Sequence, residues 1–295
     1  MKEVVIISGK GGTGKTSISA SFAQLGGKDI VVADCDVDAA DMHLLLNPDF
    51  AESENFFSGF NAVINQQACD LCSNCFEVCR FEAIQILNSE YAVNSVNCEG
   101  CGYCARVCPT KAISMEEQNV GKWYISNTKS GNKMVHARLG IGAENSGKLV
   151  AKVKNEAKRL AEEYNKEMII VDGSPGIGCP VVSSLSGANF VLLVTEPTVS
   201  GLHDLKRVYE LVKKFNIKAG CIINKSDLNP EKSIEIINYL KSEEIIHIID
   251  LPYDDIFTEA MTVGKTIVEY NGNTIKPFLE ESWEKIKDIT LVKEN

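Results

Sequence analysis

The sequence has no long apolar run, no excess of basic charge and no recognisable export signal. None of its apolar stretches approaches the roughly 20 residues of a membrane-spanning helix, so we expect no stable membrane insertion. Forty acidic residues outnumber 30 lysines and arginines, for a net charge of −10. This balance argues against nucleic-acid or anionic-membrane binding through overall charge, although it leaves room for a local basic patch. Because no basic segment and apolar stretch precede the first strand pattern, we expect a soluble, cytoplasmic protein.

Cysteine is the one anomaly in an otherwise ordinary globular composition. Hydrophobic residues make up 44% of the chain and charged residues 24%, which excludes disordered and fibrous architectures. A length of 295 residues suggests two domains, or one large domain with an insert. Eight of the 11 cysteines fall between residues 69 and 108. In a protein that is not exported, such clustered thiols are more typical of metal ligands than of disulfides.

Both ends of the chain have an α/β pattern. Continuous apolar runs predict buried strands at 4–7, 30–33, 168–171, 190–194, 221–223 and 245–249. Helical spacing predicts helices over 16–25, 146–164 and 275–289. Strands of this kind, alternating with helices, indicate a mostly parallel sheet covered on both faces. The last helix has no basic face, so we expect its apolar stripe to dock on the protein core rather than on a membrane.

The middle of the chain has a different composition and an internal repeat. Four cysteines followed by an Ala-Ile pair occur twice, the pairs being Ala83-Ile84 and Ala112-Ile113. We therefore place a small duplicated α+β domain at 60–117, inserted in an α/β domain formed by 1–59 and 118–295. Downstream of the insert, the pattern of 121–139 predicts two strands joined by a turn at Lys129–Asn132.

A glycine-rich loop follows the first predicted strand and precedes the first helix. It matches the phosphate-binding pattern G-x-x-x-x-G-K-[ST] over Gly9-Lys10-Gly11-Gly12-Thr13-Gly14-Lys15-Thr16. Glycines let successive backbone N–H groups surround a phosphate, and the helix that follows adds its positive dipole end. Lys15 then reaches the β- and γ-phosphates, and the Thr16 hydroxyl ligates Mg²⁺. The alternative, a glycine-rich turn without a ligand, does not account for the complete pattern.

The extra lysine, Lys10, makes this loop similar to the deviant phosphate loop of the MinD/ParA superfamily of P-loop ATPases. Four further motifs follow in that family's order. Asp34-Cys35-Asp36 resembles its first switch, and Asp172 with 173–176 resembles its Walker B strand and second switch. Asn224 resembles its adenine-contacting asparagine, and residues 251–254 resemble the loop that closes over the base. The resemblance covers roughly 1–47 and 146–290.

The resemblance implies a set of functional residues for a Mg²⁺-dependent ATPase. Lys10 reaches phosphate, often across a dimer interface, and Asp36 orients the attacking water. Asp172 supports Mg²⁺ through water. The implied catalytic group consists of Lys10, Lys15, Asp36 and Asp172. The implied nucleotide-binding residues are Gly11, Gly12, Thr13, Gly14, Lys15, Thr16, Ser17, Asn224, Pro252 and Asp254. The implied assembly is a homodimer or a heterodimer with a paralogous ATPase. Taken alone, Asp36 and Asp172 would be ordinary acidic residues at strand ends.

The two cysteine runs resemble those of bacterial ferredoxins with two [4Fe–4S] clusters. In that pattern the fourth cysteine of each run ligates the other cluster. The resemblance therefore assigns one cluster to Cys69, Cys72, Cys75 and Cys108, and the other to Cys98, Cys101, Cys104 and Cys79. Zinc is the weaker alternative, because zinc sites usually pair two C-x2-C halves. Arg80 departs from the pattern where proline is expected. The inserted domain, with the segments 136–139 and 144–148, resembles one branch of MinD-superfamily ATPases.

Two classes of function follow. The leading hypothesis is an ATPase that couples nucleotide state to electron transfer or to metallocofactor assembly, with a redox or cofactor-receiving protein as its partner. The C-terminal half has no C-x-x-C of the kind that holds a bridging cluster in carrier ATPases, which slightly favours electron transfer. The alternative is a MinD-like regulatory or positioning switch whose clusters are structural or redox-sensing. Of the remaining cysteines, Cys35 and Cys221 are expected in the core, and Cys179 either packs or faces a partner.

Overall fold

The computed structural model describes residues 1–140, 146–270 and 274–291 and divides into two compact units. The first unit comprises Met1–Glu54, Trp123–Arg138 and Ser146–Asn295, and the second comprises Asn55–Lys122 and Leu139–Asn145. The division lies outside the 60–117 boundaries drawn from the sequence. The reason is that two long strands, β3 (Glu52–Ile64) and β6 (Ile113–Asn127), run across it, whereas the cysteine-rich composition begins farther along. Residues 144 and 145 of the segment 144–148 lie outside the described residues.

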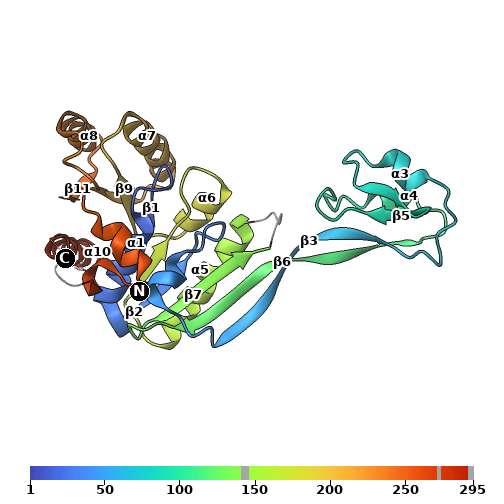
Figure 1. The fold of residues 1–295 in the computed structure, drawn as a ribbon, viewed down its shortest axis with the longest axis horizontal. Coiled ribbons are helices and arrows are strands. Elements are labelled where there is room, and N and C mark those ends of the chain that lie inside the picture. The colour runs from blue at the N-terminus through green and yellow to red at the C-terminus, as the bar shows by residue number, and fades with distance from the viewer. Residues whose placement is uncertain (141–145, 271–273, 292–295) are drawn as a thin grey trace. The chain divides into compact units, whose positions relative to one another are not determined.

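The first unit contains the parallel sheet that the sequence predicts (Figure 1). The strand order is β11-β10-β9-β1-β8-β2-β7, followed by β6 and β3. The parallel strands are β1 (Lys2–Ile7), β2 (Ile30–Asp34), β7 (Lys133–Leu139), β8 (Met168–Asp172), β9 (Phe190–Thr195), β10 (Lys218–Ile223) and β11 (Ile246–Asp250). Asp172 at the end of β8 lies opposite Ile6 of β1 and Asp34 of β2. The register therefore brings the carboxyl ends of three strands together.

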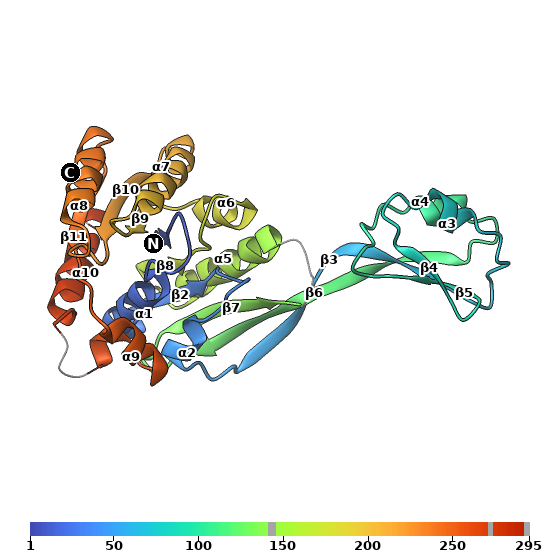
Figure 2. The same ribbon diagram turned by 45° about the horizontal axis from the view of Figure 1, so that its top comes forward.

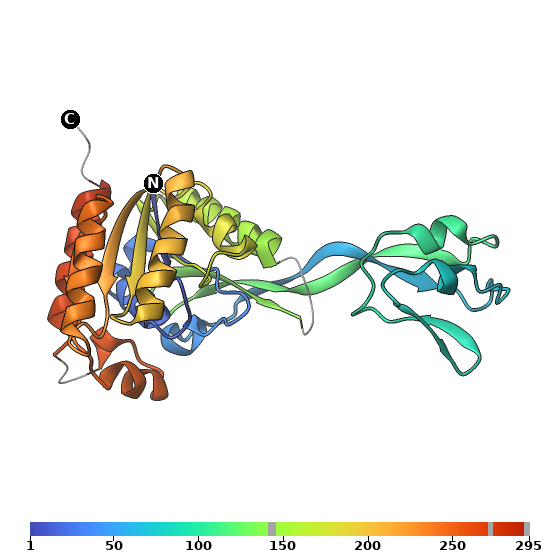
Figure 3. The ribbon, with the colours of Figure 1, turned by 90° about the horizontal axis from the view of Figure 1, so that it is seen from above.

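Helices cover both faces of this sheet (Figures 1 and 3). On one face, α1 (Lys15–Gly26) contacts α10 (Lys276–Leu291), and on the other α5 (Ser146–Glu163) contacts α6 (Cys179–Leu185). The other helical segments of this unit are η1 (Gly27–Asp29), α2 (Met42–Leu46), α7 (Val199–Lys214), α8 (Pro230–Ser242), α9 (Ile256–Thr262) and η2 (Ile267–Glu269). None of the helices among the described residues is long and apolar enough to cross a membrane.

The apolar stripe of α10 packs on the core, as predicted. Leu279 and Ile286 are fully buried, as is Ile275 just before the helix. The Trp283 ring stacks on Phe22 of α1 with 5.7 Å between the ring centroids. The predicted strand pair is also confirmed, because β6 and β7 are neighbours and the Thr128 and Asn132 backbones close the turn between them.

The sequence repeat in the second unit is accompanied by two short helices (Figure 2) and by a repeated backbone conformation. The helices α3 (Asn74–Val78) and α4 (Tyr103–Val107) contact each other, and β4 (Ile84–Leu87) pairs with β5 (Glu90–Val93). Equivalent residues of the two halves share a positive φ. The φ values are 61° for Leu71 and 63° for Gly100, 68° for Ser73 and 70° for Gly102, and 52° for Glu82 and 55° for Lys111. The halves also interlock, because Asn65 N donates to Ala112 O and Asn94 N donates to Ala83 O.

Candidate functional site

The glycine loop links β1 to α1 in a conformation that depends on its glycines. Gly12 and Gly14 have φ values of 80° and 89°, in the left-handed region that glycine adopts without strain. A Cβ on Gly14 would lie 2.5 Å from Asn224 Nδ2, and a Cβ on Gly9 would lie 2.5 Å from the backbone of Asp204. The turn and the close packing around it therefore both exclude larger residues.

Lys15 lies at the centre of the site, on the first turn of α1. Its ammonium Nζ is 2.9 Å from Asp172 Oδ1 and 3.3 Å from Asp36 Oδ2. Burial opposes the positive charge, but the two carboxylates outweigh it, so the pKa of Lys15 is raised. The structure thus brings together three residues that the sequence resemblance assigned to the catalytic group.

The Asp172 carboxylate also organises the oxygen ligands expected for Mg²⁺. Thr16 Oγ1 donates to Asp172 Oδ2 at 2.9 Å, and Ser19 Oγ donates to Asp172 Oδ1 at 2.7 Å. Hydroxyl and carboxylate oxygens, completed by phosphate and water, are the donor set that Mg²⁺ favours, so Thr16 and Asp172 fit the ion. Ser19 was not predicted from the sequence. Its only signal was its position one turn after Thr16 on the same helix.

The two switch segments contact each other directly. Ser174 Oγ donates to the Cys35 carbonyl at 2.9 Å, and Cys35 N donates to the Asp172 carbonyl at 2.8 Å. Asp34, the last residue of β2 and the first of the switch motif, is buried, and its Oδ2 has no hydrogen-bond partner among the described residues. Burial first, and then the charge of Asp172, raise the pKa of Asp34 well above its usual value. Burial also raises the pKa of Asp36, against the opposing charge of Lys15.

Of the residues expected around the base, Asn224 contacts the glycine loop directly, and the late loop contacts the segment that follows Asn224. Asn224 Nδ2 donates to the Thr13 carbonyl at 2.8 Å, a contact that the adenine assignment did not include. Tyr253 N donates to Asp227 Oδ1 at 2.6 Å, which joins the late loop, residues 251–254, to the segment that begins at Asn224. Asp254 accepts from Ile256 N at 3.0 Å and from Thr274 Oγ1 at 2.9 Å. Asn224 therefore lies beside the glycine loop, and the late loop lies beside the segment that follows Asn224; a role in binding the base stays a prediction for Asn224, Pro252 and Asp254.

Lys10 points to a residue that was not selected from the sequence. Its Nζ lies 2.6 Å from Glu196 Oε1, directly after β9. Lys225, the neighbour of Asn224, also pairs with Glu196 and donates to the Gly12 carbonyl. The sequence contains only a weak indication that Glu196 belongs to the site: it follows a buried strand, as Asp36 follows β2.

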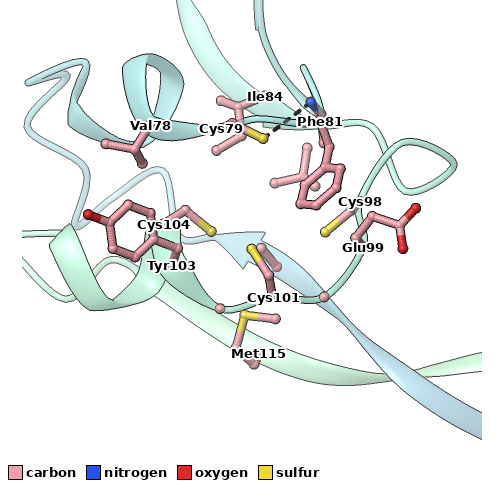
Figure 4. A pocket seen from close by; sticks show the side chains of 15 residues that line it. Val78, Cys79, Phe81, Ile84, Cys98, Glu99, Cys101, Tyr103, Cys104 and Met115 are labelled. Atoms are coloured by element: carbon pink, nitrogen blue, oxygen red, sulfur yellow. Dashed lines mark hydrogen bonds between the residues drawn. The ribbon is translucent and has the colours of Figure 1, made fainter.

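The eight clustered cysteines line two pockets in the second unit. One pocket is lined by Cys79, Cys98, Cys101 and Cys104, together with Phe81, Tyr103 and Met115 (Figure 4). The other is lined by Cys69, Cys72, Cys75 and Cys108. Two backbone amides donate to thiol sulfurs at equivalent places: Ala83 N to Cys79 Sγ at 3.4 Å and Ala112 N to Cys108 Sγ at 3.3 Å. Across the described part of the chain, no three His, Cys, Asp or Glu side chains converge on a position for a single metal ion.

The other three cysteines divide into two kinds. Cys35 and Cys221 are fully buried in the core, as predicted, and burial raises the pKa of both thiols. Cys179 is exposed at the start of α6.

Comparison with known proteins agrees with the phosphate-loop site. Residues 4–267 match the CobQ/CobB/MinD/ParA nucleotide binding domain. An uncharacterized protein of Methanocaldococcus jannaschii is 33% identical over 97% of this chain and 96% of its own length. A second uncharacterized protein of that organism is 28% identical over 95% of this chain and 96% of its own length.

Solved MinD structures have the same fold. The cell division ATPase MinD of Pyrococcus furiosus has a TM-score of 0.58 at 18% identity, covering 98% of this chain and 99% of its own. MinD of Pyrococcus horikoshii, complexed with Mg-ADP, has a TM-score of 0.59 at 18% identity, covering 98% of this chain and 96% of its own. With the family match extending over most of its length, the chain belongs to the CobQ/CobB/MinD/ParA nucleotide-binding family and carries an ATPase domain of the MinD/ParA type.

Proposed function

We propose that this protein is an ATP-driven switch of the MinD kind, whose second unit holds two [4Fe–4S] clusters that sense redox state. The observation that carries the proposal is the contact of Lys15 with one carboxylate from each switch, Asp36 and Asp172. A nucleotide phosphate that reaches Lys15 competes with both carboxylates at once. Because Ser174 of the second switch donates a hydrogen bond to the Cys35 carbonyl of the first, a movement of one switch changes a contact of the other.

The chain's own residues account for the chemistry of the switch. The loop amides and Lys15 bind the phosphates, while Thr16 and Asp172 would hold Mg²⁺, which supplies further positive charge to the phosphate oxygens. Asp36, once released from Lys15, is free to orient water for attack on the γ-phosphate. Burial raises the pKa of Asp36 and the charge of Lys15 opposes that rise, so the carboxylate becomes more basic when Lys15 is withdrawn.

The donor chemistry of the second unit fits two clusters. Each pocket is lined by four thiols, three from one run and the fourth from the other, which is the crossed arrangement of the ferredoxin pattern. The amide hydrogen bonds to Cys79 and Cys108 are of the kind that tune cluster potential. A bound cluster would supply one-electron redox chemistry.

Strand β6 offers a structural connection through which the clusters could influence the switch. Within the first unit, Ser126 of β6 is hydrogen-bonded to His136 of β7 at 2.9 Å, and His136 lies opposite Asp34 of β2. Burial, then the nearby His43, lower the pKa of His136 to about 4, so this contact is uncharged at neutral pH. The same strand β6 begins one residue after Ala112, which donates to Cys108. Strand β2, which leads into the first switch, is thus connected to the proposed cluster ligand Cys108 through its neighbour β7 and then β6.

A second candidate function is electron delivery or metallocofactor assembly, favoured by the two four-thiol pockets. It needs a redox or cofactor-receiving protein as partner, whereas a sensor needs none. Both candidates are compatible with a homodimer or with a heterodimer of paralogous ATPases, and two relatives of nearly full coverage occur in one organism. ATP-dependent, multiple-turnover reduction of an acceptor would favour this second function over the sensor.

Asp36→Asn tests the switch. We expect the variant to bind Mg-ATP nearly as well as the unmodified protein, because Lys15 keeps its pair with Asp172. Its turnover should fall by roughly 100-fold or more, the typical contribution of a positioned acid or base. ATP-induced self-association, measured by light scattering, should reverse with hydrolysis in the unmodified protein and persist in the variant.

The matched control is Asp38→Asn, which changes an exposed carboxylate two residues away and should alter neither property. An equal loss of affinity and turnover in Asp36→Asn would remove the role given to Asp36. If the association state is the same with ATP and with ADP, the protein does not act as a nucleotide-dependent switch.

A further inference from the structure

Glu196 lies beside the phosphate loop and pairs with two lysines at once. Its Oε1 is 2.6 Å from Lys10 Nζ, and its Oε2 is 2.9 Å from Lys225 Nζ. The Glu196 side chain is only 13% exposed. Burial opposes its ionisation, but the hydrogen bonds from both lysines outweigh burial and keep the pKa of Glu196 below its usual value. Glu196 is therefore a carboxylate, shared between two ammonium groups, at neutral pH.

Both lysines belong to the phosphate loop or touch it. Lys10 is a loop residue, and its Nζ also contacts Ser200 Oγ at 3.0 Å. Lys225 donates to the Gly12 carbonyl at 3.2 Å. Glu196 is thus connected to the loop at two points, one through each lysine.

The backbone holds Glu196 in this place. Thr198 N donates to the Glu196 carbonyl at 2.8 Å, and Thr198 Oγ1 caps α7 by accepting from Gly201 N at 2.9 Å. A Cβ on Gly201 would lie 2.2 Å from the Glu196 carbonyl oxygen, so the turn requires glycine there. The position of the carboxylate is consequently set by a tight turn and a capped helix, not by a free loop.

We infer that Glu196 is a positioning residue of the ATPase: it retains Lys10 on its own protomer and must release it before that lysine binds nucleotide phosphate. The inference rests on the proposed role of Lys10 in binding phosphate. The Lys10 ammonium is paired at 2.6 Å with a carboxylate that it shares with Lys225, so a phosphate that binds Lys10 competes with Glu196. Glu196 and the nucleotide therefore compete for one cation, and the carboxylate sets how readily the ATP-bound form is reached.

The test is Glu196→Gln, which keeps the size of the side chain and removes its charge. Binding of Mg-ATP, measured by calorimetry, should become about fivefold tighter, which corresponds to the loss of a competing ion pair of ~1 kcal/mol. The gain should disappear in Lys10→Ala/Glu196→Gln, because the freed lysine is then absent. Glu243→Gln, which breaks a similar pair with Lys213 (2.9 Å) on the protein surface, should leave the affinity unchanged.

The results separate this inference from the proposed function. If Lys10→Ala weakens ATP binding but Glu196→Gln, with an unchanged melting temperature, fails to strengthen it, Glu196 does not restrain Lys10 and the inference is wrong. The inference is equally wrong if the gain survives in the double variant. If Lys10→Ala alone leaves both binding and turnover intact, the proposed role of Lys10 fails, and the inference fails with it.

Discussion

Replacing Lys15 with alanine should abolish ATP binding and also destabilise the fold. The ammonium that faces the phosphates is lost, and we expect the affinity for Mg-ATP to fall by roughly 100-fold or more. In addition, Asp36 and Asp172 keep their burial but lose their shared counter-ion. Leaving a buried charge unpaired costs about 3–5 kcal/mol of the free energy of unfolding. Calorimetric titration with Mg-ATP and denaturant unfolding measure the two effects.

Two further variants separate binding from stability. Lys15→Ala combined with Asp36→Asn removes one unpaired carboxylate, so it should regain part of the stability while still failing to bind ATP. Lys213→Ala breaks an exposed pair with Glu243 and should leave the stability nearly unchanged. Wild-type affinity in a folded Lys15→Ala protein would contradict the phosphate-loop assignment.

Cys108→Ala should remove the cluster that is bound by cysteines far away in the sequence. Anaerobically purified protein is expected to hold about eight irons and eight sulfides per chain, and the variant about half of each. Cys108 lines the pocket of Cys69, Cys72 and Cys75, not that of its sequence neighbours. Iron and sulfide analysis with electron paramagnetic resonance of the reduced protein measures the loss.

Double variants identify which cluster has been lost. Cys72→Ala added to Cys108→Ala affects the same pocket, so about four irons should remain. Cys101→Ala added to Cys108→Ala affects both pockets, so almost no iron should remain. Cys72 and Cys101 are both exposed and occupy equivalent places in the repeat, which makes them a matched pair. The reverse pattern of iron contents would show that each run ligates its own cluster.

The sequence predicted those parts of the fold and site that local pattern determines. Most of the parallel strands were found within three residues because they are short apolar runs that are buried on both faces; the edge strand β11 is only partly buried, and β7 was predicted as half of a strand pair. The glycine loop was found because a phosphate-binding turn imposes residue types at fixed spacing along one segment. Lys15, Asp36 and Asp172 were grouped only through the family resemblance, and the register of β1, β8 and β2 brings the ends of these strands together.

Features that depend on contacts distant in sequence were missed. β3 has no apolar alternation over Glu52–Ile64, most of which is exposed, so neither its length nor its passage across the unit boundary could be predicted. Glu196 pairs with Lys10 only because the fold brings the end of β9 beside a loop that is far away in the sequence. Likewise, the tether from Asn224 to Thr13 depends on the close approach that Gly14 permits.

The most direct test of the account is the midpoint potential of the clusters with and without nucleotide. If the nucleotide switch and the clusters are coupled, Mg-ATP must shift a potential, and reduction must change ATP affinity by the same factor. A typical coupling of about 1–3 kcal/mol corresponds to a shift of tens of millivolts or more, since 59 mV is tenfold for one electron. We predict such a shift in a spectroelectrochemical titration of the anaerobic protein, its retention in Asp36→Asn and its loss in Lys15→Ala. Identical potentials with ATP, with ADP and without nucleotide, in protein shown to bind ATP, would contradict the account.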